Sequence, residues 1–255
     1  MRNQLSTSEV LGVPIARLDP GSALDETQRL YEDAAPAMLT YVNAHTLNLA
    51  ASDSSYAELL RSAELVLNDG KGVLLAGLIL GRRFPADLNG NFFTPLLLDH
   101  AAASGWSIYI LGARPGVAER VADVLKAKHP GLTIAGTMHG HFSADDEDDV
   151  VTRIRAANPG LLLVGMGNPL QERFLARRLK ESGARVGLGV GAYLDFQVGE
   201  ATRAPAWMNR IGIEWLHRLT QEPRRMWRRY LLGNPLFVWR VLRTRLRRGI
   251  RSKTS

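Results

Sequence analysis

The residues best able to perform chemistry in this 255-residue sequence follow short apolar runs, and Asp69 in the stretch "LVLNDGKG" is the first of them. In open parallel sheets, ligands bind at the carboxyl ends of the strands, so a polar residue directly after a strand is a candidate for substrate contact. With Gly70 and Gly72 beside it, the Asp69 carboxylate can approach a substrate hydroxyl and accept its proton as a general base. An aspartate here can also cap the helix that follows, and the sequence leaves both interpretations open.

The second candidate is the stretch "VGMGNPLQE", which combines a glycine turn with the start of a helix. Gly167 allows close approach to the backbone, Asn168 can act as an N-cap, and Pro169 suits the first helical position. Exposed amide groups at such a helix start favour a phosphate or a ribose hydroxyl, and Gln171 and Glu172 in the first turn would face the same ligand. Asn168 and Gln171 can equally form a capping box, because a G-x-G turn alone is a weak sign of nucleotide binding.

Two other polar clusters look like metal sites, but the sequence favours structural roles for both. The D-x-D at 146–148 follows Ser143 at the predicted start of a helix, where acidic side chains interact favourably with the helix dipole. His139 and His141 flank a glycine without a third candidate ligand nearby, which makes a poor metal site. Because the chain has no cysteine, thiolate ligands, disulfide bonds and thiol nucleophiles are excluded, and we expect neither a metal nor another cofactor.

Apolar runs, glycine-containing turns and amphipathic stretches alternate between about 38 and 198, as they do in βαβ units. The runs are continuously apolar, which is typical of parallel strands that are buried on both faces. We therefore predict an α/β fold with a Rossmann-like parallel sheet and flanking helices. Strands are predicted at 38–44, 63–69, 107–111, 132–140, 161–167 and 185–191. Helices are predicted at 45–51, 73–81, 115–128, from about 145, and at 169–181.

The C-terminal part of the chain differs in charge from the rest. From Thr202 to the end there are 14 Lys and Arg residues but 2 Asp and Glu, a net charge of +12, whereas the preceding residues carry −5. We place a domain boundary there, with an α/β body at 1–201 and a basic, aromatic-rich helical appendage at 202–255. Proline at 205, 223 and 235 predicts breaks or kinks in the appendage.

The appendage has the features of a helical segment that docks onto an anionic membrane surface. Aromatic and leucine side chains at 215, 227, 230–232, 237 and 239 suit the headgroup level, and each nearby Lys or Arg adds about 1 kcal/mol of attraction. The uncharged runs at 72–81 and 230–239 are shorter than the roughly 18–20 residues that a spanning helix needs, so we expect peripheral attachment. A solvated basic tail is the alternative, and the apolar patch could also pair with another subunit in a homo-oligomer.

Five separated motifs, found in order, resemble those of the WecG/TagA/CpsF glycosyltransferases. The resemblance extends from about Tyr41 to Leu232, and the opening "YVNAHTLNLA" is most similar to the exopolysaccharide branch that includes GumM. The motifs are "LNDGKGV", "YILGARPGVAERVADVLKAKHPGL", "GHF", "LLLVGMGNPLQERFL" and "VGLGVGAYLDFQVGEATRAPAWMNRIGIEWLHRLTQEPRRMWRRYL".

The resemblance implies an inverting transfer of a sugar from a UDP-sugar donor to an undecaprenyl-diphosphate-linked sugar, in exopolysaccharide or cell-wall polymer synthesis. It also implies a peripheral protein at the cytoplasmic face of the membrane. The aspartate of the family's D-G motif falls on Asp69, which would be the general base. The family's G-x-P-x-Q-E motif begins at Gly167 and places Gln171 and Glu172 against the donor nucleotide. Such enzymes are thought to need no metal.

Four arginines are carried over by the same resemblance. The arginine of the R-A-P motif falls on Arg203. Those of the family's terminal appendage fall on Arg218, Arg225 and Arg228, where they would face the diphosphates and the lipid head group. Guanidinium groups can stabilise a leaving diphosphate without a metal. The spacings of seven and three predict that the last three arginines share a helix face if Pro223 only kinks the helix.

Three positions depart from the family's pattern and belong to the presumed sugar pocket. Tyr41 stands where several members carry the threonine of T-x-N, whose asparagine is Asn43. In the stretch "ADLNGNFF", Asp87 occupies the position of the arginine in the family's R-V-x-G-x-D motif, and Phe92 occupies the position of its aspartate. Asn89 lies between them. An arginine fits an acidic or N-acetylated sugar, whereas a neutral hexose needs only hydrogen-bonding groups. The donor is therefore left open between a hexose and an N-acetylhexosamine.

Two other classes of protein fit the sequence less well. A Rossmann-type nucleotide-binding protein such as a dehydrogenase should open with G-x-G-x-x-G and carry an acidic residue about twenty residues later, and both are missing. A nucleic-acid-binding protein would explain the basic C-terminal segment, but no recognised binding motif accompanies it, so we expect no nucleic-acid partner. Sedimentation with lipid vesicles or with DNA distinguishes membrane docking from nucleic-acid binding, because an interfacial helix buries aromatic side chains in lipid, whereas a DNA-binding tail does not.

Overall fold

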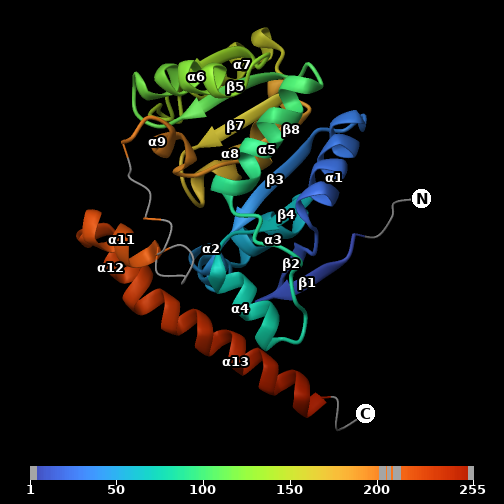
Figure 1. The fold of residues 1–255 in the computed structure, drawn as a ribbon, viewed down its shortest axis with the longest axis vertical. Helices are drawn as coiled ribbons and strands as arrows, with labels where there is room; N and C mark the ends of the chain where they lie inside the picture. The colour runs from blue at the N-terminus through green and yellow to red at the C-terminus, as the bar shows by residue number, and fades with distance from the viewer. Residues whose placement is uncertain (1–4, 201–204, 206–207, 209–213, 252–255) are drawn as a thin grey trace.

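A six-stranded parallel β-sheet forms the centre of the computed structural model, which describes residues 5–200, 205, 208 and 214–251 (Figure 1). The strand order is β4-β3-β8-β7-β5-β6, and each neighbouring pair is parallel. All six predicted strands are confirmed, and so is the α/β class. The strands are β3 (Ala37–Val42), β4 (Leu65–Asn68), β5 (Ser107–Gly112), β6 (Thr133–Met138), β7 (Leu161–Gly165) and β8 (Val186–Gly189).

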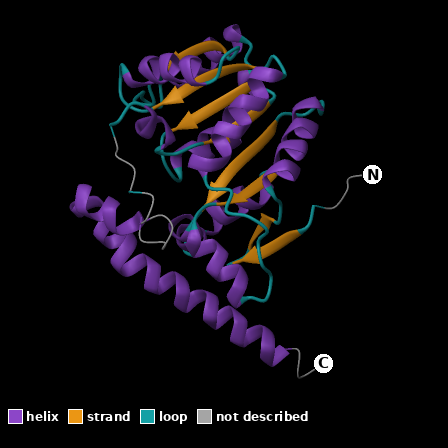
Figure 2. Cartoon of the chain, in the orientation of Figure 1, coloured by secondary structure: helices purple, strands orange, loops and turns teal. Residues whose placement is uncertain are grey.

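Helices cover both faces of this sheet (Figure 2). Successive strand residues point to opposite sides, and apolar side chains on both sides need to be covered. In β7, Leu161 and Leu163 join the apolar cluster on one face, whereas Leu162 and Val164 join the cluster on the other. The first cluster is completed by α1 (Pro20–Glu32), α5 (Gly90–Ala103) and α6 (Val117–Lys128). The second is completed by α7 (Glu147–Ala157) and α8 (Leu170–Ser182).

A third apolar cluster lies beside β4, at one edge of the sheet. There an antiparallel hairpin packs with three helices from the first third of the chain and with a C-terminal helix described below, and the sequence analysis did not predict this hairpin. It also did not predict α1, α3, α5 or the short helix α9 (Tyr193–Gln197). The elements of the third cluster are β1 (Thr7–Val10), β2 (Val13–Ala16), α2 (Ala44–Ala50), α3 (Ser54–Ser62) and α4 (Lys71–Ile79).

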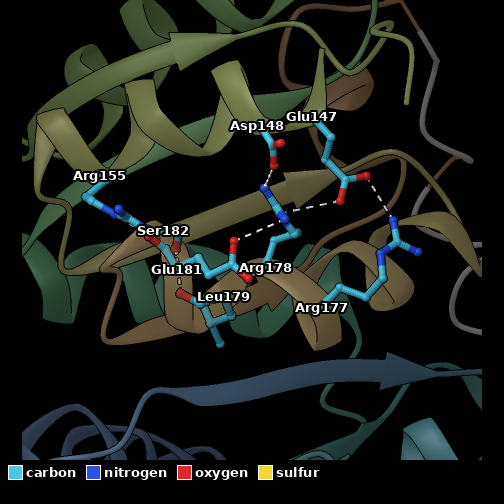
Figure 3. A network of polar contacts seen from close by, with 8 residues as sticks. All are labelled: Glu147, Asp148, Arg155, Arg177, Arg178, Leu179, Glu181 and Ser182. Carbon is cyan, nitrogen blue, oxygen red and sulfur yellow. Dashed lines mark hydrogen bonds and ion pairs between the residues drawn. The ribbon is translucent and has the colours of Figure 1, made fainter. Parts of the chain in front are cut away.

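The acidic D-x-D segment lies at the start of α7, as predicted, and the side chains of Glu147 and Asp148 face α8 (Figure 3). Glu147 accepts from Arg177 at 2.9 Å, and Asp148 pairs with Arg178. Arg178 also lies 3.0 Å from Glu181, one turn further along its own helix. The acidic residues therefore join two neighbouring helices on the surface of the sheet.

The C-terminal described segment is helical, but it is not one kinked helix. Glu222 has φ −130° and ψ 64°, which ends α11 and allows Pro223 to begin a new helix. Arg218 therefore lies on a different helix from Arg225 and Arg228, so the condition for their predicted shared face, a single helix that Pro223 only kinks, is not met. The segments are α11 (Glu214–Gln221), α12 (Pro223–Trp227), a π-helical turn η1 (Arg228–Leu232) and α13 (Gly233–Arg251).

Helix α13 packs along α2 and α4, as Figure 1 shows. Phe237 and Val241 are buried in the third apolar cluster. Polar contacts fix the same interface, because Asn48 donates to the carbonyl oxygen of Gly233 at 2.7 Å and Arg240 donates to Asn48 Oδ1 at 3.0 Å. Helix α13 thus completes part of the core next to β4, while the predicted boundary between residues 201 and 202 stays a prediction.

Candidate functional site

Asp69 and Asn43 meet at the carboxyl ends of two neighbouring strands, β4 and β3. Asn43 Nδ2 donates to Asp69 Oδ2 at 3.0 Å. The orientation of the Asn43 amide is fixed because its Oδ1 caps α2 and accepts the backbone N–H groups of His45 and Thr46, each at 3.1 Å. Asp69 itself does not cap α4, whose N-cap is Gly70 without a side-chain hydrogen bond, so the capping interpretation of Asp69 is wrong.

The environment of Asp69 favours proton acceptance from a substrate. Burial raises the pKa of its carboxyl group above the ordinary value, and the hydrogen bond from Asn43 opposes that shift. The negative charge of Asp87 raises the pKa further, while Arg229 and Arg218 lower it. A carboxylate with a raised pKa is a stronger base, which is what a general base for a sugar hydroxyl requires.

Asp87 lies beside Asp69 on a segment that β4 holds in place and that also carries Asn89. Asn68 is buried, and its Nδ2 donates to the carbonyl oxygen of Ala86 at 2.7 Å. Asp87 Oδ1 in turn accepts the N–H of Gly70 at 2.9 Å. Asn89 caps α5 through its Oδ1. The segment that departs from the family pattern is therefore attached directly to the strand that carries the candidate base.

Tyr41 lies beneath this segment. Its ring is buried, its hydroxyl lies 3.0 Å from Thr94 Oγ1, and burial raises its pKa. A Cβ atom at Gly90 would lie 3.4 Å from the Tyr41 ring, so the ring supports the start of α5 from below. Phe92, by contrast, is 46% exposed on the same helix.

The G-x-P-x-Q-E segment folds differently from the prediction. The N-cap of α8 is Pro169, and Asn168 donates to Glu172 Oε1 at 2.6 Å, so Asn168 is not an N-cap. The N–H of Gly167 is not exposed to a ligand either, because it donates to Gln171 Oε1 at 3.2 Å. Gln171 and Glu172 are 2% and 0% exposed and face the interior. This segment thus offers an open glycine backbone, with its polar side chains beneath.

The four predicted arginines fall in different surroundings. Arg218 lies over the ring of Phe196 at 5.0 Å, and Arg228 lies over Trp227 at 5.3 Å. Arg225 belongs to α12, and its side chain is outside the described residues, as is the whole of Arg203. The charge of Arg218 also acts on Asp69 and lowers its pKa.

Arg229 and His45 are two residues of this region that the sequence analysis missed. Burial and the charge of Arg229 lower the pKa of His45 to about 4, so its imidazole is neutral at neutral pH. Both residues line a cavity of about 350 Å³ between α2 and α13. Its other polar lining includes Arg228 and Arg240. The position of His45 two residues after Asn43, at the start of a helix that follows a strand, was the available signal.

Two features are absent from the described ranges. No three His, Asp or Glu side chains gather there as a metal site would require. None of the helices in those ranges is long and apolar enough to cross a membrane.

A desolvated carboxylate and glycine loops at the carboxyl edge of a parallel sheet are typical of α/β enzymes, which bind their ligands at the strand ends. A family model described as "Glycosyl transferase WecG/TagA/CpsF family" matches residues 8–251, so the chain belongs to this family of glycosyltransferases.

Relatives from three bacteria carry the same name, N-acetylglucosaminyldiphosphoundecaprenol N-acetyl-beta-D-mannosaminyltransferase. The protein of Bacillus subtilis is 29% identical over 240 residues, which cover 94% of this chain and 92% of that protein. The protein of Bacillus spizizenii is 31% identical over 194 residues, or 76% and 74% of the two chains. That of Staphylococcus aureus is 26% identical over 246 residues, or 96% and 95%. These names do not test the exopolysaccharide branch, which stays a prediction.

Proposed function

We propose that this protein is a membrane-associated inverting glycosyltransferase that moves a sugar from a UDP-sugar to an undecaprenyl-diphosphate-linked sugar. The observation that carries the proposal is Asp69, a desolvated carboxylate held by Asn43 at the strand ends of a chain that belongs to a glycosyltransferase family. The names of the relatives support the lipid-linked acceptor, since each includes a diphosphoundecaprenol.

In the proposed reaction, an acceptor hydroxyl attacks the anomeric carbon of the donor from the side opposite the diphosphate. Asp69 takes the proton of that hydroxyl as the new C–O bond forms and the bond to the diphosphate breaks. The leaving diphosphate gains negative charge, which cationic side chains stabilise. Arg218 and Arg229 are described residues whose charge already acts at Asp69, and Arg203, Arg225 and Arg228 are proposed to assist them.

The donor nucleotide is proposed to lie along the loops that follow β5, β7 and β8. The connections of β5 and β7 run in opposite directions along the sheet, and such a switch point is where open α/β sheets bind ligands. Gly167 and Gly191 leave open space where a side chain would point, which allows close approach of a ligand to the backbone. Asp87, next to Asp69, and Asn89 on the same segment are proposed to contact the sugar.

The proposed membrane surface is formed by η1 and α13. Trp239 is 54% exposed and Leu246 is 68% exposed on α13, and arginines accompany them. Exposed aromatic and leucine side chains with arginines fit an anionic bilayer surface, where apolar burial and charge attraction add together. The protein would then act as a peripheral protein at the cytoplasmic face. Further exposed apolar side chains on the same segments are Leu231, Leu232, Leu236 and Leu242.

The donor sugar is proposed to be a hexose or an N-acetylhexosamine, for exopolysaccharide or cell-wall polymer synthesis. The relatives' names mention an N-acetylmannosaminyl group, while Asp87 in this chain stands at an arginine of the family pattern. A panel of UDP-sugars with undecaprenyl-diphosphate-linked acceptors, read by product mass, tests the proposal. A product that gains one sugar residue is expected, and the absence of transfer from every UDP-sugar would contradict it.

Membrane attachment is tested separately by sedimentation with anionic vesicles. The double variant Trp239→Ala with Leu242→Ser should reduce binding about tenfold or more, since it removes two exposed anchors. Leu170→Ser is the control, because Leu170 is 62% exposed on α8, which is not part of the proposed surface. Equal binding of both variants would place the membrane contact elsewhere.

A further inference from the structure

Gln171 joins the loops that follow β7 and β8. Its Oε1 accepts the N–H of Gly167 at 3.2 Å and the N–H of Gly191 at 2.9 Å. Its Nε2 donates to Glu172 Oε1 at 2.7 Å. One buried side chain therefore fixes the backbone of two loops at adjacent strand ends.

Glu172 anchors this side chain from below. Besides Gln171, its Oε1 accepts from Asn168 Nδ2 at 2.6 Å and from Thr40 Oγ1 at 3.3 Å. Its Oε2 accepts from the Tyr56 hydroxyl at 3.1 Å. The donors come from β3, α3, α8 and the loop after β7, so a single carboxyl group ties four parts of the fold together.

The two glycines present their other side to open space. Gly167 has φ +78° and Gly191 has φ +54°, both in the left-handed region that favours glycine. No atom lies within 4 Å of the position that a Cβ would occupy at either residue. The loops are thus held through their amide groups on the inner side, while their backbone is accessible on the outer side.

We propose that Gln171 and Glu172 are positioning residues that hold the loops of Gly167 and Gly191 as one surface for the donor nucleotide without touching it. Direct contact would require Gln171 or Glu172 to leave buried hydrogen bonds, and each unpaired buried group is costly. Thr40 and Tyr56 belong to the same assembly, since both donate to Glu172. The identity of the ligand rests on the proposed function, whereas the link between the two loops does not.

A reciprocal exchange of side chains tests this inference in the full-length chain. Gln171→Glu keeps an acceptor for both glycines, but it places a carboxylate oxygen against Glu172 Oε1 where an N–H group donates now. Adding Glu172→Gln restores a donor to that contact with the roles exchanged. The new Nε2 group donates to the carboxylate at position 171 once Asn168 and Thr40, which now donate to Glu172 Oε1, turn their hydrogens away from it. Gln28→Glu is the matched control, because Gln28 lies on α1 and contacts His100 and Glu32.

Two measurements follow these variants: UDP affinity by calorimetry, and amide exchange at Gly167 and Gly191 by NMR of protein labelled with ¹⁵N-glycine. Gln171→Glu should weaken UDP binding about tenfold or more and speed exchange at both glycines together, because their shared acceptor is disturbed. The double variant should recover to within about threefold of the wild-type affinity, since the buried donor–acceptor pair is restored. Gln28→Glu should change neither quantity.

A double variant no better than Gln171→Glu alone would overturn the proposal, as would exchange that changes at only one glycine or at neither. Tyr56→Phe gives a second test that keeps the ring and removes a single donor; it should speed exchange at both glycines to a smaller extent, and no change would also overturn the proposal. If the wild-type protein binds no UDP, the proposed donor is wrong, while the exchange data still decide whether Gln171 links the loops.

Discussion

Asp69 and Glu172 are two carboxyl groups at the same edge of one sheet, and the protein holds them in opposite ways. Asp69 keeps part of its surface exposed and accepts from Asn43, with Arg218 and Arg229 nearby. Glu172 is fully buried and accepts from four side chains. Burial raises the pKa of both groups. The chemical group and the direction of the pKa shift are thus the same at both positions. What distinguishes a carboxyl group that can exchange a proton with a substrate from one that organises the fold is its accessibility to the substrate and its hydrogen-bond partners.

The largest effect is expected for Asp69→Asn, which should lower kcat by about a hundred- to ten-thousandfold, the usual cost of losing a general base. The amide keeps the shape of the carboxyl group but cannot take the proton. Thermal unfolding and UDP titration serve as controls and should show a folded protein with near wild-type affinity. Wild-type turnover in this variant would remove Asp69 from the mechanism.

Glu172→Ala should instead lower stability, by about 3 kcal/mol or more in the free energy of unfolding. Several buried donors lose their acceptor, and each costs about 1–3 kcal/mol. Denaturant unfolding measures the loss, and Glu172→Gln, which keeps an acceptor, should lose less. A loss below about 1 kcal/mol would show that the buried hydrogen bonds contribute little.

Arg229→Ala should move the acidic limb of the pH–rate profile to higher pH. The positive charge of Arg229 lowers the pKa of Asp69, so its removal raises that pKa and leaves the base protonated at a higher pH. Arg224→Ala is a suitable control, because Arg224 is an exposed residue of α12. An identical limb in both variants would mean that Arg229 does not act on the catalytic group.

The smallest effect concerns stability and pH at Glu172. Its pKa is raised in the folded protein, so the folded state holds this proton at pH values where the unfolded chain has released it. The stability that this group contributes is therefore present at pH values below its pKa in the unfolded chain, and it is lost as the pH rises through its pKa in the folded protein. The free energy of unfolding should fall less in Glu172→Gln than in the wild type as the pH rises above about 4.5, the ordinary pKa of a glutamate side chain. Parallel wild-type and variant curves would contradict a raised pKa.

Much of the fold followed from local pattern, since continuous apolar runs and glycine turns predicted every strand of the parallel sheet. Hairpin β1–β2 and helix α5 were missed because their residues become buried through contacts with distant parts of the chain. In the same way, the sequence placed Asp69 and Asn43 at strand ends, but it could not show that β3 and β4 are neighbours.

The burial of Gln171 and Glu172 was not predictable from their own segment. The groups that enclose Glu172 include Thr40 and Tyr56, which are far away in the sequence. Similarly, Arg229 was overlooked because its charge acts on Asp69, which lies 160 residues earlier in the chain, and spacing within the C-terminal segment cannot reveal such a long-range approach.

The central claim, that the Asp69 carboxylate is the base for sugar transfer, is tested most directly by transfer rates of the wild type and Asp69→Asn across a range of pH with saturating donor and lipid acceptor. We expect the wild-type rate to rise with pH through a single midpoint above 3.8, the ordinary aspartate value, because burial raises the pKa of Asp69. The Asp69→Asn rate should stay low and lack this step. A step of the same height and midpoint in both proteins would contradict the claim.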